Sequence, residues 1–291
     1  MTKLTFRSLA AGAAGSLMLA ASAVAGTTTA AAPKAPVPVP PPAETVGLFD
    51  SVGVTFEAGY DSEYYFRGLW FSSNNVWTSA ALSIPLADKL TLTPGVLYTS
   101  SVDTDIPGSF EYSELDLFAG LSYDAGFAKF GLAYTYYSFF DTFSGSVDGT
   151  TFGFPNAPDS TISGAQDLGF TVNKSFFGLN TTVGYWYDFK IDGQYFEAAF
   201  DYPVKVNNWL TLVPAAAIGY GIDYYTYTQV TGVDDGWTHV RVALSAPIQL
   251  TKSAILTPYI AGNFSLDARD QINTVKGRND VYGGVKLSVS F

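Results

Sequence analysis

The sequence predicts an all-β fold: a transmembrane, antiparallel, up-and-down β-barrel of about twelve strands. Three observations carry this prediction. Apolar residues recur with a period of two after residue 47, and short and long connections alternate along the chain. Only 14% of the residues are charged, whereas 16% are aromatic. Because a soluble domain carries about 25% charged residues, the deficit indicates a surface that faces lipid.

The composition also excludes several other classes of protein. There is no cysteine, so the chain is neither a disulfide scaffold nor a Cys-ligated zinc protein. The 26 acidic residues outnumber the 15 basic ones, for a net charge of −11, and this balance repels nucleic acid. The aromatic content is too high for a disordered chain.

The N-terminal part divides into two segments that precede the barrel. Residues 1–25 have the features of a signal peptide: basic Lys3 and Arg7, a short apolar run, and the small residues Ala23 and Ala25 at a cleavage site. Residues 26–47 are rich in Pro, Ala and Thr, which favours an extended periplasmic linker. We therefore expect export across an inner membrane, with the barrel over residues 48–291.

Alternation is clearest in the last segment, where Val281, Val285 and Leu287 share one face and Tyr282 and Lys286 share the other. The same pattern predicts strands near residues 52–68, 76–86, 89–100, 111–123, 127–139, 166–176, 178–189, 194–205, 209–223, 237–249, 253–266 and 280–291. A tilted spanning strand needs about 9–11 residues, and each of these segments is long enough.

The connections between these strands sort by parity. Those after even strands are tight turns, at 87–88, 124–126, 177, 206–208 and 251–252. Those after odd strands are mostly longer and polar, at 101–110, 140–165, 224–236 and 267–279, with 69–75 and 190–193 as shorter exceptions. Short periplasmic turns and longer outer loops are typical of outer-membrane barrels, whereas a soluble β-sandwich has no reason to segregate them.

Prolines recur on both sides of three of the tight turns: Pro85 and Pro94, Pro203 and Pro214, Pro247 and Pro258. Proline removes a ladder donor and belongs near strand ends or bulges. The pattern is typical of a barrel built by hairpin repetition, although a simple preference for proline beside turns explains it equally well.

Charged strand residues share the parity that faces inward, as a lipid-facing wall requires. These and the single histidine are the candidate pore-lining residues: Glu57, Glu63, Arg67, Glu114, Asp116, Lys129, Asp167, Asp188, Lys190, Glu197, Asp201, Asp223, His239, Arg241 and Lys286. They either pair across strands and brace the barrel, or line an aqueous path and set its selectivity. For Arg67 and Arg241 we favour a structural ion pair over capture of an anionic solute.

Aromatic residues occupy two further sets of positions. One set lies on the apolar face near the long-loop ends, where a girdle belongs: Tyr60, Tyr64, Phe66, Tyr134, Tyr136, Tyr185, Tyr187, Phe189 and Tyr220. The other set, with lumen parity, is Trp77, Trp186, Tyr195 and Tyr259, which either stack on a sugar or fill the lumen.

Two short segments resemble known outer-membrane proteins. The end of the chain, Val285-Lys286-Leu287-Ser288-Val289-Ser290-Phe291, resembles the C-terminal signal of bacterial outer-membrane proteins. This resemblance implies that Val285, Leu287, Val289 and Phe291 are read by the barrel assembly machinery. The segment Ser62-Glu63-Tyr64-Tyr65-Phe66-Arg67-Gly68 is similar to the first-strand motif of the TorF-type porins. That similarity implies a small barrel whose solute is undefined.

Together these features predict a porin-like channel in the bacterial outer membrane, in contact with lipid and passing small hydrophilic solutes. We expect no cofactor, no metal site and no enzymatic activity. One alternative is a closed barrel for structure, adhesion or tethering to the cell wall. A less favoured one is a lipid hydrolase, for which His239 is the only histidine base, and Ser245 lies about 20 Å along the same strand at about 3.3 Å per residue.

Overall fold

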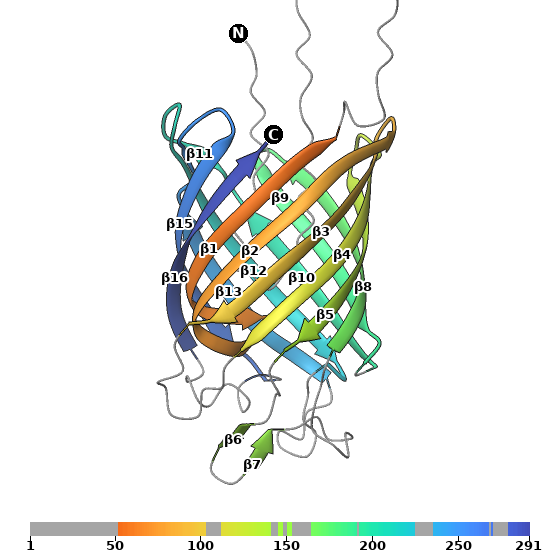
Figure 1. Cartoon of the computed structure of the whole chain (residues 1–291), viewed down its shortest axis with the longest axis vertical. Coiled ribbons are helices and arrows are strands. Elements are labelled where there is room, and N and C mark those ends of the chain that lie inside the picture. Colours follow the sequence, from red (N-terminus) through yellow and green to blue (C-terminus); the bar gives the residue numbers. More distant parts are fainter. Residues whose placement is uncertain are drawn as a thin grey trace, which may run out of the picture.

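The computed structural model describes residues 52–102, 112–140, 145–147, 150–152, 164–190, 192–224, 235–267, 269 and 279–291. Within these ranges, twelve antiparallel strands form the wall of a closed barrel (Figure 1). The expected signal peptide and linker lie outside the described residues. The wall strands are β1 (Gly53–Phe66), β2 (Leu69–Ala87), β3 (Leu90–Ser101), β4 (Ser113–Asp124), β5 (Lys129–Phe139), β8 (Gly164–Phe176), β9 (Leu179–Asp188), β10 (Gly193–Asp201), β12 (Thr211–Ile222), β13 (Asp235–Ser245), β15 (Ala254–Ser265) and β16 (Asn279–Ser290).

The first and last strands close the barrel. β1 pairs with β16 from Thr55↔Ser290 to Asp61↔Gly284, and every other wall strand pairs with the wall strand that follows it in the chain. Closure leaves no sheet edge with unpaired backbone groups, which hydrocarbon cannot solvate. The up-and-down, twelve-stranded prediction is therefore confirmed. Among the described residues, no helix is long and apolar enough to cross a membrane.

Two connections differ from the expected layout. β2 begins at Leu69 rather than near residue 76, so only Arg67 and Gly68 separate it from β1. Both residues have positive φ, 50° and 79°, as a two-residue type I′ hairpin turn requires. Within 140–165, expected to be a loop, the backbone of β6 (Gly145–Val147) pairs with that of β7 (Thr150–Phe152).

Prolines interrupt three strands at the short-turn end of the barrel. Pro203 separates β10 from β11 (Val204–Lys205), and Pro247 separates β13 from β14 (Ile248–Gln249). In β2 the register shifts between Pro85 and Ala87. Because proline cannot donate to the ladder, each strand breaks or bulges where the sequence repeat places it.

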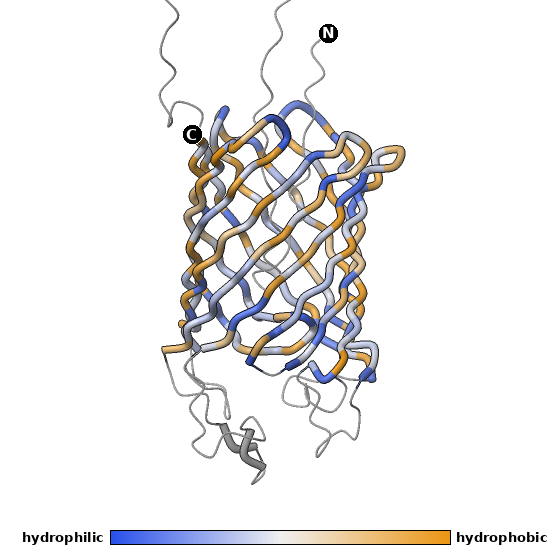
Figure 2. Tube along the Cα trace, turned by 90° about the vertical axis from the view of Figure 1, so that its right-hand side faces the viewer, coloured by the Kyte–Doolittle hydropathy of each residue, from blue (hydrophilic) through white to orange (hydrophobic). Residues whose placement is uncertain are grey.

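Hydrophobic and hydrophilic residues alternate along the wall strands (Figure 2). The outward side chains are largely apolar, and the inward ones include most of the charged residues. In β4, for example, Leu117 and Leu121 are exposed, whereas Glu114 and Asp116 point inward and are buried. On the strands described, outward charges occur only near the rims, at Lys174 of β8 and Asp235 of β13. This partition follows from the cost of placing a charge in hydrocarbon, about 2–4 kcal/mol at the midplane.

Exposed aromatic side chains form a band near each rim. At the long-loop end, the hydroxyls of Tyr60 and Tyr220 donate to Asn74 and Asp235 at 2.7 and 3.1 Å. Tyr64 and Phe66, expected in this band, instead lie inside the barrel. The band at the short-turn end, which the sequence pattern did not single out, comprises Phe127, Phe176, Phe177, Tyr202, Trp209 and Phe291.

Candidate functional site

The end of the β1–β2 hairpin leaves the wall and folds into the lumen. β1 pairs with β16 only as far as Asp61, and β2 pairs with β3 only from Asn75. Between residues 62 and 74, the ladder partners that the structure describes, from Glu63↔Ser73 to Phe66↔Leu69, lie within the same segment, which we name the lumen hairpin. Tyr64, Tyr65 and Phe71 are buried although they belong to no wall ladder. A register shift between Tyr64 and Tyr65 bends the strand inward, as β-bulges do, which removes Tyr64 and Phe66 from the girdle.

Arg67, at the tip of the lumen hairpin, reaches the far wall. Its Nη2 atom lies 2.6 Å from Asp167 Oδ2 of β8, and both side chains are almost fully buried. Its Nη1 donates to the hydroxyl of Tyr224, which follows β12. Tyr137 of β5 also donates to Asp167 Oδ2, at 3.0 Å. The buried charge is thus paired and hydrogen-bonded, which is the condition for retaining an ion pair inside a protein.

Four aromatic rings surround the Arg67 guanidinium. Its Cζ atom lies 4.6 Å from the ring centroid of Phe66, 5.0 Å from Trp186, 5.2 Å from Tyr195 and 5.3 Å from Tyr224. These distances fall within the range of cation–π attraction, about 6 Å. We call Asp167 and these four rings the cation cage. Tyr224 lies one residue beyond the expected strand 209–223, so the alternation of the sequence did not indicate that it faces the lumen.

Gly68, the second residue of the turn, lies directly against His239 of β13. A Cβ atom on Gly68 would lie 2.5 Å from His239 Nδ1, so only glycine fits there. His239 itself is 3% exposed, and its Nδ1 lies 3.0 Å from Thr238 Oγ1. The single histidine therefore packs against the hairpin tip inside the barrel.

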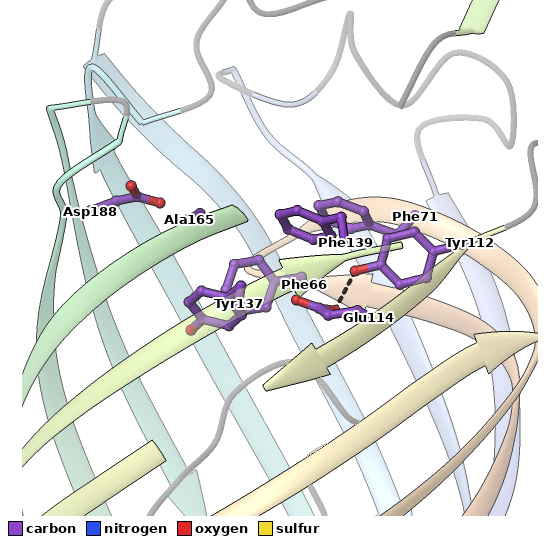
Figure 3. Close-up of a pocket in the computed structure, with 8 residues that line it drawn as sticks. All are labelled: Phe66, Phe71, Tyr112, Glu114, Tyr137, Phe139, Ala165 and Asp188. Carbon is purple, nitrogen blue, oxygen red and sulfur yellow. Dashed lines mark hydrogen bonds between the residues drawn. The ribbon is translucent and has the colours of Figure 1, made fainter. Parts of the chain in front are cut away.

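Both flanks of the lumen hairpin are also anchored. On one side the Tyr65 hydroxyl donates to Asp280 Oδ2 at 3.0 Å, and its ring packs on Tyr282. On the other side Phe66 and Phe71 meet Tyr112, directly before β4, and two aromatic residues of β5 around a small pocket (Figure 3). Its lining is Phe66, Phe71, Tyr112, Glu114, Tyr137, Phe139, Ala165 and Asp188. The hairpin thus touches much of the barrel circumference.

Burial divides the lumen into two halves. Near the hairpin, inward Asp61, Thr99 and Asn263 are at most 1% exposed. Toward the short turns most inward side chains, such as Thr93 and Asn173, are half-buried. There Lys286 Nζ lies 3.0 Å from Glu57 Oε1, which also accepts from Ser288 at 2.7 Å. The lumen is therefore filled in its long-loop half and more accessible from the short-turn end.

The structure separates the candidate pore-lining residues into five groups. Arg67 and Asp167 form the buried ion pair, and Glu114, Asp116, Asp188, Glu197 and His239 are buried around the hairpin. Glu63 and Arg241 are half-buried, and so is Lys129 at the short-turn end of β5. Asp201, Glu57 and Lys286 lie in the short-turn half. Asp223, expected at the end of a strand, and Lys190, expected directly after one but counted with the inward charges, are exposed beyond the ends of β12 and β9, since each strand ends one residue earlier than the alternation suggests.

The four lumen aromatic residues separate into two pairs rather than one stacking surface. Trp77 and Tyr259 both donate to Asp61, Trp77 at 2.9 Å. Trp186 and Tyr195 belong to the cation cage. Trp186 lies flat on the wall because β9 carries glycine beside it: a Cβ on Gly184 would lie 2.1 Å from the Trp186 ring.

Comparison with known proteins gives likenesses of fold only. No protein-family model matches the chain, and no curated protein matches it. An outer-membrane channel from Pseudomonas putida F1 is 13% identical, with 82% of this chain and 94% of that chain covered and a TM-score of 0.47. The translocator domain of the autotransporter NalP from Neisseria meningitidis is 14% identical (82% and 88% covered, TM-score 0.48), and the KdgM porin is 10% identical (81% and 99% covered, TM-score 0.45).

Proposed function

We propose that the chain is a bacterial outer-membrane channel for small hydrophilic solutes, with the lumen hairpin as its constriction. The observation that carries this proposal is the closed barrel with an apolar outer face and a charged, hydrogen-bonding inner face. Lipid accounts for the outer face, and water or a polar solute accounts for the inner one. Long loops then face outward and short turns face the periplasm.

The lining behind the hairpin favours a channel over a permanently filled structural barrel. Several inward positions of β10, β12, β13 and β15, between larger inward side chains such as Arg241 and Tyr259, carry small residues: Ala199, Ala215, Ala217, Gly219, Ala243 and Ala261. A barrel filled by its own wall residues needs large inward side chains there. Here one hairpin, rather than the wall, occupies the lumen, so its withdrawal opens a path.

The hydrolase alternative lacks support in the geometry. A base acting on lipid has to reach the outer surface, whereas His239 lies inside the barrel, against Gly68 and Thr238. His239 therefore serves as the packing surface for the tip of the lumen hairpin.

The exposed apolar ridge of β16 is the proposed contact with the barrel assembly machinery. Val285, Leu287 and Phe291 are exposed on the outer face, and the half-buried Val289 lies on the same side. Phe291 also hydrogen-bonds through its backbone to Val54 of β1, so the ridge lies beside the seam where the barrel closes.

Removal of the hairpin tests the channel. Glu63 and Ser73 are cross-strand partners, so replacement of residues 64–72 by Asn-Gly joins them through a type I′ turn. In planar bilayers we expect the shortened barrel to carry a steady K⁺ current about tenfold above that of the unaltered protein. Lys252→Ala, at an exposed short turn, is the control. A shortened barrel that is folded, as judged by its heat-dependent gel mobility, yet passes no current refutes the channel and favours the closed structural barrel.

A further inference from the structure

We propose that the cation cage is a binding site for solutes that carry a guanidinium group, and that Arg67 is its resident occupant. This inference rests on the proposed channel function and names the class of solute. In the structure the site is filled by a side chain of the same chain. A free solute of the same chemistry competes with that side chain for the cage.

The cage has the features that select an organic cation. Asp167 supplies the negative charge, and four rings face the guanidinium at 4.6–5.3 Å. Aromatic faces attract weakly hydrated, delocalised cations such as guanidinium, and they offer little to a compact, strongly hydrated ion. A divalent metal ion takes six or more oxygen ligands, whereas the cage presents rings on most sides.

Unused acceptors beside the cage point to the same conclusion. The Oδ1 atom of Asp116 and the Oε1 atom of Glu197 are buried and have no hydrogen-bond partner among the described residues. Asp116 is the cross-strand partner of Tyr137, which donates to Asp167. Glu197 accepts from the Tyr195 hydroxyl at 2.8 Å through its other oxygen. These two oxygens can accept hydrogen bonds from a solute that carries more donors than the Arg67 side chain.

A vacated cage favours a replacement cation. Without Arg67, the carboxylate of Asp167 stays buried and keeps only the Tyr137 hydroxyl among the partners described. A buried, unpaired carboxylate is costly, so a guanidinium from solution recovers what the departing side chain contributed. Arg269, which donates to the Tyr224 carbonyl oxygen at 3.0 Å, holds one wall of the cage in place.

The test uses Arg67→Ala in the full chain, with ethylguanidinium as the probe and ethylurea as its uncharged counterpart. In detergent we expect millimolar ethylguanidinium to raise the melting temperature of the variant saturably, and ethylurea to have no such effect. The unaltered protein, whose cage is filled, should show a smaller shift. Should Arg67→Ala fail to fold, Arg67→Gln retains the bulk of the side chain and serves in its place.

A second variant separates the cage from nonspecific binding. In Arg67→Ala/Asp167→Asn, asparagine keeps the shape of the carboxylate and removes its charge, and we expect affinity for ethylguanidinium to fall by about tenfold or more. An unchanged affinity in this double variant, or an equal shift with ethylurea, overturns the cage.

Bilayer recordings of the unaltered protein test whether the site serves solutes. Competition with Arg67 predicts that ethylguanidinium raises the K⁺ current saturably and that ethylurea does not. If Arg67→Ala binds ethylguanidinium but the current of a conducting wild type does not respond to it, the cage only holds Arg67 in place. That result overturns the solute assignment. Binding of ethylguanidinium by Arg67→Ala, together with a hairpin-shortened barrel that is folded and silent, would instead refute the channel and uphold the cage.

Discussion

Arg67 and Asp167, 100 residues apart in the chain, form a buried ion pair of 2.6 Å across the barrel lumen. Along the wall, β3, β4 and β5 separate β2 from β8. The pair therefore joins the tip of the lumen hairpin to a strand that lies four positions from β2 along the wall.

Asp167→Asn should release the lumen hairpin. It leaves the buried Arg67 without its counter-charge, and loss of one partner of a buried ion pair costs about 3–5 kcal/mol. We expect a lower melting temperature and a larger K⁺ current in planar bilayers. Asp88→Asn, at an exposed short turn, removes the same charge and should change neither. A conductance equal to the wild type would show that the ion pair does not hold the hairpin.

Gly68→Ala should prevent the tip of the lumen hairpin from packing against His239 of β13. The added Cβ meets His239 Nδ1 at 2.5 Å on a backbone with φ of 79°, and strain of this kind costs about 1–3 kcal/mol. Gly126→Ala is a matched control, since Gly126 has φ of 85° and no atom within 4 Å of the added Cβ. Gly68→Ala should lower the melting temperature more than Gly126→Ala does. Adding His239→Ala to Gly68→Ala should restore part of the loss. If the two glycine variants unfold alike, contact with His239 is unimportant.

Lys286→Ala should make the channel more selective for cations. Its ammonium group neutralises Glu57 at 3.0 Å in the accessible half of the lumen, so its removal leaves an uncompensated carboxylate beside the path. The reversal potential in a KCl gradient should shift toward the K⁺ equilibrium value, with the permeability ratio rising by roughly twofold. Glu57→Gln should shift it in the opposite direction. The same potential in both variants would place this pair away from the ion path.

Leu117→Arg should destabilise the inserted barrel, because the exposed Leu117 side chain lies on the outer face near the middle of β4. An arginine at the bilayer midplane costs about 2–4 kcal/mol. Val102→Arg, exposed beyond the end of β3, should be tolerated. Equilibrium unfolding in lipid vesicles measures both. An equal loss of stability in the two variants would contradict the proposed membrane band.

Deletion of Phe291 should lower the yield of assembled barrel in cells. Its ring lies 6.4 Å from that of Phe56, and its backbone exchanges two hydrogen bonds with Val54 at the β1–β16 seam. Fractionation of the outer membrane followed by heat-shift electrophoresis measures the assembled fraction. Refolding of the purified variant into detergent is the control: loss in cells but not in vitro indicates recognition by the assembly machinery, whereas equal loss in both indicates only a weakened seam.

The sequence by itself determined the wall of this barrel. Side chains alternate between lipid and lumen along every strand. The opposite orientations of Leu117 and Asp116, or of Leu287 and Lys286, can therefore be predicted from the local sequence alone. Loop lengths then give the order and direction of the strands, and the prolines mark where strands break.

Only the tertiary structure decided what fills the lumen. Residues 62–74 keep a β pattern whether they continue the wall or turn inward, so alternation placed Tyr64 and Phe66 toward lipid when both lie inside. Their position depends on a bulge and on contacts with β5, β8, β9 and β13 that are distant in sequence, such as Arg67 with Asp167 and Gly68 with His239. Local periodicity carries no information about such contacts, because they form only once the barrel has closed around the hairpin.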